Sequence, residues 1–211
     1  FDECSSLSHI LIGSSVSSIG DFAFRKCSSL TKVTFDLNSS LTSIGKFCFI
    51  ECKSLAEITI PSSLRSVGDF SFANCSSLVK VSFLSTDTSF GCSSFYNCSS
   101  LVAIILPSSI KTINDELFYQ CSSLSEFIIP SSVTLIGEGA FGGCSSLSKI
   151  TIPSSVKSIG RRAFFKCISL SEITIPSSVT IIEDEVFKNC FSLKHITITS
   201  PVLIKSKAFN E

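Results

Sequence analysis

The chain has 211 residues, which is enough for one or two globular domains or for one array of repeats. Its 17 basic residues balance 17 acidic ones, so the net charge is zero. Nucleic acids and anionic membrane surfaces attract an excess of lysine and arginine, so the balance argues against both as the main partner. The longest apolar run, residues 102–106, is far too short to cross a bilayer. With 44% hydrophobic residues and a mean hydropathy of +0.47, the composition predicts many short buried strands.

Cysteines mark an internal repeat that runs through the whole chain. Successive members of this set are 23 residues apart, except for one spacing of 25. The members are Cys4, Cys27, Cys52, Cys75, Cys98, Cys121, Cys144, Cys167 and Cys190. Self-similarity at a fixed period of about 20–50 residues is the signature of a solenoid or a related repeat architecture. The sequence therefore predicts about nine units of 23 residues.

Each unit contains a Leu-x-x-Ile-x-Ile pattern that predicts a short strand. In the clearest unit these positions are Leu147, Ile150 and Ile152. Alternating apolar residues indicate a strand with one buried face, and the β-branched side chains agree with this. Pro153 follows directly and ends the strand, because proline has no N–H to donate to a neighbouring strand.

A second apolar stretch follows the proline, as in Val156-x-x-Ile159-Gly160. Glycine tolerates a positive φ, so we expect one at this residue, where the chain bends. Phe164 comes four residues later, and a phenylalanine recurs at this point in every unit. The segment from the glycine to the next cysteine is expected to form one helical turn, since a longer helix does not fit.

One unit of this size cannot fold alone. Burying about seven side chains at roughly 2 kcal/mol each does not offset the cost of ordering the backbone at roughly 1–2 kcal/mol per residue. Stacked units bury both faces of each coil and pair the strands into a parallel sheet. Residues 1–211 are therefore expected to form a single array. Phe1 and Phe209 fall at the same point of the repeat and neither end shows a polar capping unit, so we expect a fragment of a longer array.

One stretch of the repeat carries a family resemblance. It reads Ile152-Pro153-Ser-Ser-Val156-x-x-Ile159-Gly160-x-x-Ala163-Phe164-x-x-Cys167-x-Ser169-Leu170. This pattern covers the whole chain and resembles the BspA-like leucine-rich repeats of the Treponema type, in a serine-rich form similar to protist surface families. The resemblance implies a right-handed leucine-rich-repeat superhelix with a parallel β-sheet on the concave face. It also implies cell-surface display or secretion and adhesion to other proteins, with no catalytic residues.

Three units depart from the pattern. Asp36–Ser40 adds two residues. Leu84–Cys92 lacks the proline and has Asp87 where other units have a core aliphatic residue. Thr199–Ser206 is one residue short. We expect bulged or mobile loops at these places.

The eleven cysteines leave three alternatives: disulfides, a metal site, or an inward stack of thiols. Nine of them occupy one column, which favours a stack of small apolar side chains. Such cysteines lie within disulfide reach but would have to rotate to bond, and the chain has no Cys-x-x-Cys motif for zinc. Cys48 is expected to be buried, whereas Cys92 is the better candidate for an exposed thiol.

No constellation of residues indicates catalysis. His9 and His195 lie at opposite ends of the array, so no Ser-His-Asp arrangement is expected, and the chain has no glycine-rich phosphate loop. We therefore expect no enzyme activity, no metal and no cofactor. Asn38, Asn74 and Asn97 begin glycosylation sequons, whose use the sequence leaves open.

Strand residues between the core columns are expected to face a partner protein. Charges of opposite sign often occupy neighbouring units, which fits either a ladder of ion pairs within the chain or a partner-facing surface. The residue between the last two core columns is mostly Thr or Ser, but it is Ile at Ile105 and Ile128. An apolar centre with a polar rim is typical of an interaction site. The predicted protein-binding patch comprises Val79, Lys80, Val102, Ala103, Ile105, Glu126, Ile128 and Lys149.

The sequence leaves three functions open. The first is an adhesive module that binds host extracellular-matrix or cell-surface proteins, or other microbes. The second is an intracellular protein-interaction scaffold that uses the same face. The third is an architectural spacer. None of them involves nucleic acid or insertion of this chain into a membrane.

Overall fold

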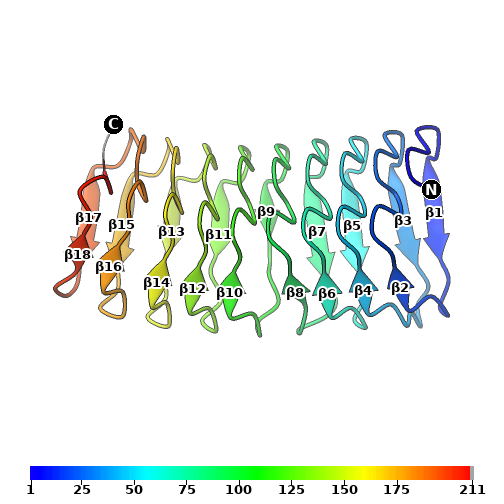
Figure 1. Ribbon diagram of the computed structural model, residues 1–211, viewed down its shortest axis with the longest axis horizontal. Coiled ribbons are helices and arrows are strands. Elements are labelled where there is room, and N and C mark those ends of the chain that lie inside the picture. Colours follow the sequence, from blue (N-terminus) through cyan, green and yellow to red (C-terminus); the bar gives the residue numbers. More distant parts are fainter. Residues whose placement is uncertain (210–211) are drawn as a thin grey trace.

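The computed structural model describes residues 1–209 and shows a solenoid of parallel strands. Each coil contributes two strands, and the coils stack along a single axis (Figure 1). The first strand has two to four residues and the second has two. Throughout residues 1–209 the secondary structure consists of strands and turns, without a helix. The predicted repeat solenoid is therefore confirmed.

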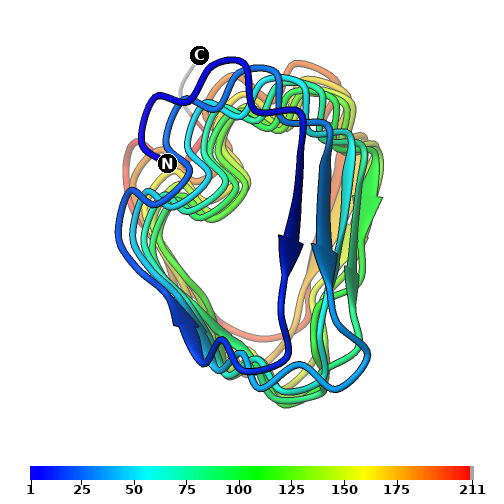
Figure 2. The same cartoon turned by 90° about the vertical axis from the view of Figure 1, so that its right-hand side faces the viewer.

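The odd-numbered strands follow the Leu-x-x-Ile-x-Ile pattern, and the even-numbered strands follow the second apolar stretch. The odd-numbered strands are β1 His9–Ile12, β3 Lys32–Phe35, β5 Glu57–Ile60, β7 Lys80–Phe83, β9 Ala103–Ile104, β11 Glu126–Ile128, β13 Lys149–Thr151, β15 Glu172–Ile175 and β17 His195–Ile198. The even-numbered strands are β2 Ser18–Ile19, β4 Ser43–Ile44, β6 Ser66–Val67, β8 Ser89–Phe90, β10 Thr112–Ile113, β12 Leu135–Ile136, β14 Ser158–Ile159, β16 Ile181–Ile182 and β18 Leu203–Ile204. We number the coils 1 to 9, so that coil 5 holds β9 and β10. The side formed by the odd-numbered strands is called the long-strand face; Figure 2 shows these strands together on one side of the coil outline.

Strand pairing is parallel and in register with the repeat, but it is not continuous. The long-strand face divides into β1-β3, β5-β7-β9 and β11-β13-β15-β17, and the other side divides between β8 and β10. Each interruption lies next to a phenylalanine in a column that mostly holds smaller aliphatic residues: Phe35 in β3, Phe90 in β8 and Phe127 in β11. Pairing is also shortened to one residue pair between β13 and β15, where no phenylalanine stands, so the interruptions do not follow from ring size alone.

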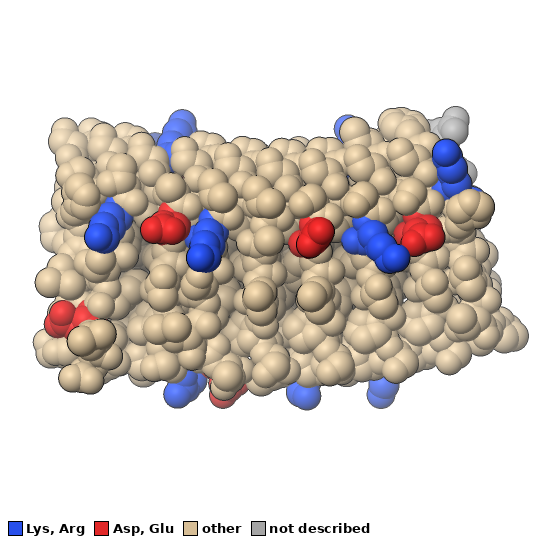
Figure 3. Space-filling model, turned by 180° about the vertical axis from the view of Figure 1, so that it is seen from behind, with Lys and Arg blue, Asp and Glu red and all other residues tan. Residues whose placement is uncertain are grey.

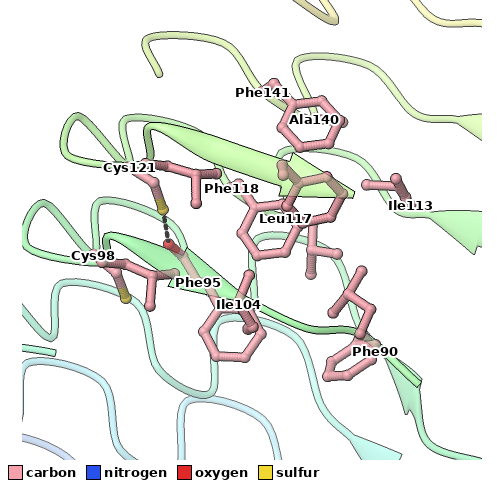
Figure 4. Close-up of a cluster of buried hydrophobic side chains, with 14 of the residues drawn as sticks. Phe90, Phe95, Cys98, Ile104, Ile113, Leu117, Phe118, Cys121, Ala140 and Phe141 are labelled. Carbon is pink, nitrogen blue, oxygen red and sulfur yellow. Dashed lines mark hydrogen bonds between the residues drawn. The ribbon is translucent and has the colours of Figure 1, made fainter. Parts of the chain in front are cut away.

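The core consists of columns of equivalent side chains. The recurrent phenylalanines form one continuous stack from Phe1 to Phe209, with ring centroids 5.1–5.7 Å apart. The cysteines lie beside this stack, and each thiol after Cys4 donates a hydrogen bond of 3.0–3.2 Å to the phenylalanine carbonyl of the preceding coil. Figure 4 shows this bond between the Cys121 thiol and the Phe95 carbonyl oxygen. The predicted inward stack of thiols is confirmed.

The segment between the glycine position and the cysteine is not the predicted helical turn. In coil 1 some of its N–H groups donate to the next coil, as from Phe22 to the Lys46 carbonyl at 3.0 Å and from Lys26 to the Ile50 carbonyl at 2.8 Å. Phe22 and Lys26 both have a positive φ, near 59° and 55°, and other coils carry a similar pair four residues apart. Other N–H groups donate within the segment, as from Arg25 to the Phe22 carbonyl at 3.0 Å, so the segment is a run of turns and not a helix.

The repeated glycine of coil 7 lies where neighbouring coils approach closely, and it does not have the predicted positive φ. A Cβ atom on Gly160 would lie 2.6 Å from the backbone nitrogen of Glu138 in the preceding coil. Gly160 does not have a positive φ, whereas Gly139 and Gly143 do. Asn114 occupies the glycine position in coil 5, where the pairing between β8 and β10 is absent. Glu183 and Lys205 occupy the same position in coils 8 and 9, where the short strands still pair. The glycine therefore fits a close approach between coils but is not needed for every pairing.

We predict that Gly160→Ala lowers the free energy of unfolding by about 1–3 kcal/mol, because the new methyl group forces neighbouring backbones apart. Gly20→Ala is the matched control, because nothing lies within 4 Å of its added Cβ. That variant is expected to be neutral within about 1 kcal/mol. Urea unfolding followed by circular dichroism measures both changes. Equal stabilities for the two variants would contradict the close-approach explanation.

The three irregular segments differ in outcome. At Asp36–Ser40 the chain bulges outward: Leu37 is fully exposed, and the Asp36 carboxylate accepts a 2.9 Å hydrogen bond from the Ser14 N–H. At Thr199–Ser206 the expected bulge is replaced by a regular strand, because β18 pairs with β16.

In the segment Leu84–Cys92, Asp87 does not enter the core position. Asp87 is exposed and Thr88 is buried instead. The Thr88 hydroxyl donates a hydrogen bond of 3.1 Å to the Leu64 carbonyl of the preceding coil. Burying a carboxylate without a partner is far more costly than burying a hydrogen-bonded hydroxyl, which explains the shift by one residue.

Candidate protein-binding face

The structure brings the eight residues of the predicted patch together on the long-strand face. They come from four neighbouring coils, in or directly beside β7, β9, β11 and β13. All eight are exposed: Val79, Lys80, Val102, Ala103, Ile105, Glu126, Ile128 and Lys149. Ile105 and Ile128 are the most prominent, with 83% and 84% of their surfaces accessible to solvent. Equivalent positions in neighbouring coils hold Thr59, Ser82 and Thr151, so the fold does not require isoleucine here.

A groove of about 650 Å³ lies on this face between β7 and β9. Pairing of these strands ends at Val81 and Ile104. The groove is lined by the patch residues Val79, Lys80, Val102, Ala103 and Ile105, and by residues 81–83, 85–86, 104 and 106–108. Its walls are mainly apolar side chains, and we infer that it is open because pairing stops halfway along β7. The patch is therefore a hollowed surface and not only an exposed strand.

Sequence reasoning missed the contribution of Phe83, Leu106 and Pro107 to this groove. A signal was present, because coil 4 lacks the proline and carries Phe83 and Phe90 in aliphatic columns. The two rings pack edge to face at 5.3 Å. A smaller groove of about 360 Å³ lies between β3 and β5, and the exposed Leu37 forms part of its wall.

A single row of charges crosses the long-strand face, one residue per coil. Figure 3 shows it as alternating basic and acidic side chains with one interruption near the middle. The row is His9, Lys32, Glu57, Lys80, Ala103, Glu126, Lys149, Glu172 and His195. Within residues 1–209, Lys149 and Glu172 form the one ion pair of the row, at 3.3 Å. The predicted ladder of ion pairs is thus formed at one step of the row, and the other charges remain directed to solvent.

The family of the chain follows from its whole-length repeat. The model of the BspA type leucine rich repeat region matches residues 1–125 and 111–211, with six copies. The chain belongs to the BspA-type leucine-rich-repeat family. No curated protein matches it.

Several solved structures are similar to this BspA-type repeat protein. A leucine-rich repeat protein from Bacteroides ovatus is 28% identical, covering 97% of this chain and 76% of the other, with a TM-score of 0.49. A leucine rich cell surface protein from Faecalibacterium prausnitzii is 24% identical over 92% and 79%, with a TM-score of 0.42. The leucine-rich repeat protein of T. pallidum is 23% identical over 93% and 72%, with a TM-score of 0.43.

The thiols of this BspA-type repeat are structural groups. Burial raises the pKa of Cys121 to about 12 and that of Cys190 to about 11, so both stay protonated at neutral pH. A neutral thiol is neither a nucleophile nor a metal ligand. Cys48 is buried as predicted, whereas Cys92 is half-buried and the exposed thiol is Cys4. In the part of the chain that the structure describes, no three His, Cys, Asp or Glu residues are grouped so that they could hold a metal ion.

The three sequons differ in their surroundings. Asn38 lies exposed in the bulge of coil 2. Asn74 and Asn97 are half-buried, and the Asn97 side-chain amide donates a hydrogen bond of 2.9 Å to the Asn74 side-chain oxygen. Both also have a positive φ. Of the three asparagines, Asn38 has the most accessible side chain.

Some charged and aromatic groups outside this face interact with one another across neighbouring coils. Glu185 binds Arg161 and Arg162, and hydrogen bonding to Arg162 lowers the pKa of its carboxyl group. Tyr96 and Tyr119 stack at 5.4 Å on the turn side of the coils. No helix among residues 1–209 has the length and hydrophobicity that a membrane span requires.

Proposed function

We propose that this chain is the adhesive module of a cell-surface or secreted protein and that it binds partner proteins through its long-strand face. The observation that carries the proposal is the exposed pair Ile105 and Ile128 in adjacent coils, at a position that holds Thr or Ser in the coils on either side. An apolar centre with a polar rim is the usual anatomy of a protein interface. The partners are host extracellular-matrix or cell-surface proteins, or proteins of other microbes.

Three features support a protein partner in preference to a small substrate. The groove is open along the sheet and continuous with the exposed isoleucines. Lys80 and Glu126 flank its apolar centre and present charges of opposite sign. Burying an isoleucine completely contributes roughly 1.5–3 kcal/mol, so two such residues supply a substantial part of a micromolar affinity.

The experiment replaces both isoleucines by the residue typical of this position, as Ile105→Thr/Ile128→Thr. Binding of the purified chain to immobilised decellularised matrix and to whole bacterial cells is expected to weaken at least ~10-fold, because the apolar contact is lost. Ile168→Thr is the matched control, since Ile168 is partly exposed but follows Cys167, away from the long-strand face. Unchanged binding by a correctly folded double variant would remove the patch from consideration.

The free thiols favour a second candidate, an intracellular protein-interaction scaffold that uses the same face. All eleven cysteines are unpaired, and secreted proteins usually oxidise their cysteines to disulfides. Labelling intact source cells with a membrane-impermeant biotin reagent separates the two candidates. Labelled protein supports the adhesive module, and protein labelled only after lysis supports the scaffold. Absence of binding to every surface tested would leave the architectural spacer.

A further inference from the structure

The charge row of the long-strand face changes phase at its centre. Before Ala103, moving away from it toward the N-terminus, the row holds Lys80, Glu57 and Lys32. After Ala103, moving toward the C-terminus, it holds Glu126, Lys149 and Glu172. Strict alternation through Ala103 would place a lysine in coil 6, where Glu126 stands. As a result, coils at equal distances from coil 5 carry opposite charges.

We propose that the long-strand face binds a second copy of this chain, about a two-fold axis that runs parallel to the strands through coil 5. Such an axis reverses the order of the coils but keeps the direction of the strands. Lys80 of one copy then faces Glu126 of the other, and Glu57 faces Lys149. Each contact occurs twice, as the symmetry of an isologous dimer requires.

The same axis brings the apolar centre onto itself. Strand direction is preserved, so residues at one level of the sheet meet residues at the same level in the second copy. The exposed residues in and beside β9 of coil 5 therefore meet their own counterparts in the second copy. These residues are Val102, Ala103 and Ile105. Ile128 adds apolar surface one coil away, and the small side chain of Ala103 leaves room for close approach.

The charges needed for this contact are available. Lys80, Glu57 and Glu126 are exposed, and none of them belongs to an ion pair among residues 1–209. Lys149, which would face Glu57, is also exposed but pairs with Glu172 at 3.3 Å, so that contact would have to share the lysine. Lys80 lies in coil 4 and Glu126 in coil 6, and coil 5 between them carries the neutral Ala103. Pairs that are exposed at the rim contribute little each and are weakened by salt, so the dimer is expected to be weak and sensitive to ionic strength.

The inference rests on the proposed use of this face for protein binding, and charge reversal tests it. Sedimentation velocity at low salt is expected to show a dimer that forms with rising concentration. Lys80→Glu and Glu126→Lys are each expected to weaken it at least ~10-fold, because each places like charges opposite one another at two places. An equimolar mixture of the two variants is expected to dimerise again, because both contacts then join a glutamate to a lysine. Lys157→Glu, an exposed lysine away from this face, is the control and should dimerise like the unaltered chain.

Three outcomes would overturn the inference. The first is that the unaltered chain stays monomeric at low salt up to millimolar concentration. The second is that the mixture of the two variants fails to restore association. The third is that the single variants dimerise as well as the unaltered chain. The last outcome would indicate contact through the ends of the solenoid. A monomeric chain that still binds matrix or cells through Ile105 and Ile128 leaves the proposed function intact. A charge-dependent dimer that binds neither surface supports the inference and contradicts the adhesive function.

Discussion

Raising the pH from about 8 to about 10 is expected to unfold the protein cooperatively. Burial raises the pKa of eight core thiols, several of them far above the usual range. These thiols are Cys48, Cys52, Cys75, Cys98, Cys121, Cys144, Cys167 and Cys190. In the unfolded chain a cysteine ionises near pH 8.5. Above that pH the folded state therefore holds more protons than the unfolded state.

The sign and size of the effect follow from proton linkage. Stability falls with rising pH wherever the folded state binds more protons, by about 1.4 kcal/mol per pH unit for each such thiol. These eight thiols together lose about 11 kcal/mol per pH unit once the pH exceeds the unfolded-state pKa. This loss is comparable with the whole stability of a typical domain, about 5–15 kcal/mol. The stability contributed by the neutral thiols is fully present below pH 8 and is lost progressively as the pH rises from the unfolded-state pKa toward the raised folded-state pKa.

Urea unfolding at a series of pH values, with a phosphine reductant present, measures this dependence. Cys121→Ala is expected to reduce its slope by about one eighth, because it removes one of the eight thiols whose pKa burial raises most strongly. Cys4→Ala should leave the slope unchanged, since Cys4 is exposed. A stability that stays constant between pH 8 and pH 10 would show that the thiol column does not govern the alkaline limit.

The cysteine column was predictable from sequence because burial in a solenoid is periodic. Once coils are stacked in register, a residue that is buried in one coil is buried in its equivalents. Leu147, Ile150 and Phe164 were placed in the core on this argument, and all three are buried. The exposed residues of the patch follow from the same alternation, because Ile105 and Ile128 stand between buried strand positions.

The backbone between the columns was not predictable in this way. Gly160 was read as a positive-φ residue because glycine most often serves that purpose, but its role depends on the distance to Glu138 in the preceding coil. The left-handed residues are instead Arg162 and Lys166, whose side chains carry no such signal. Contacts between coils override these local preferences.

The groove was missed for a related reason. It lies where pairing between β7 and β9 ends at Val81 and Ile104, next to Phe83, and the end of this pairing is a feature of the contact between coils. The sequence shows that Phe83 occupies an aliphatic column but does not show which backbone moves in response. The sequence therefore predicts which residues are presented to a partner more reliably than it predicts the shape in which they are presented.

Phe164→Ala is expected to lower the free energy of unfolding by about 3–5 kcal/mol, the usual range for removing a buried ring. Phe164 is fully buried and stacks between Phe141 and Phe187, with centroid distances of 5.5 and 5.6 Å. Its removal leaves a cavity that is bounded by two neighbouring coils. Each coil of a solenoid is stabilised only by its neighbours, so the loss affects the contacts on both sides.

The adjacent Phe165 provides the matched control. It is half-buried, and its ring contacts Arg162 and Lys166 at centroid distances of 5.7 and 5.3 Å. Exposed contacts of this kind contribute about 0.5–1 kcal/mol each, so Phe165→Ala should destabilise the protein by less than half as much as Phe164→Ala. Urea unfolding of both variants, followed by circular dichroism, gives the comparison. Losses of equal size would mean that the phenylalanine stack does not hold the coils together, and the stability of the array would then have to come from strand pairing and the aliphatic columns.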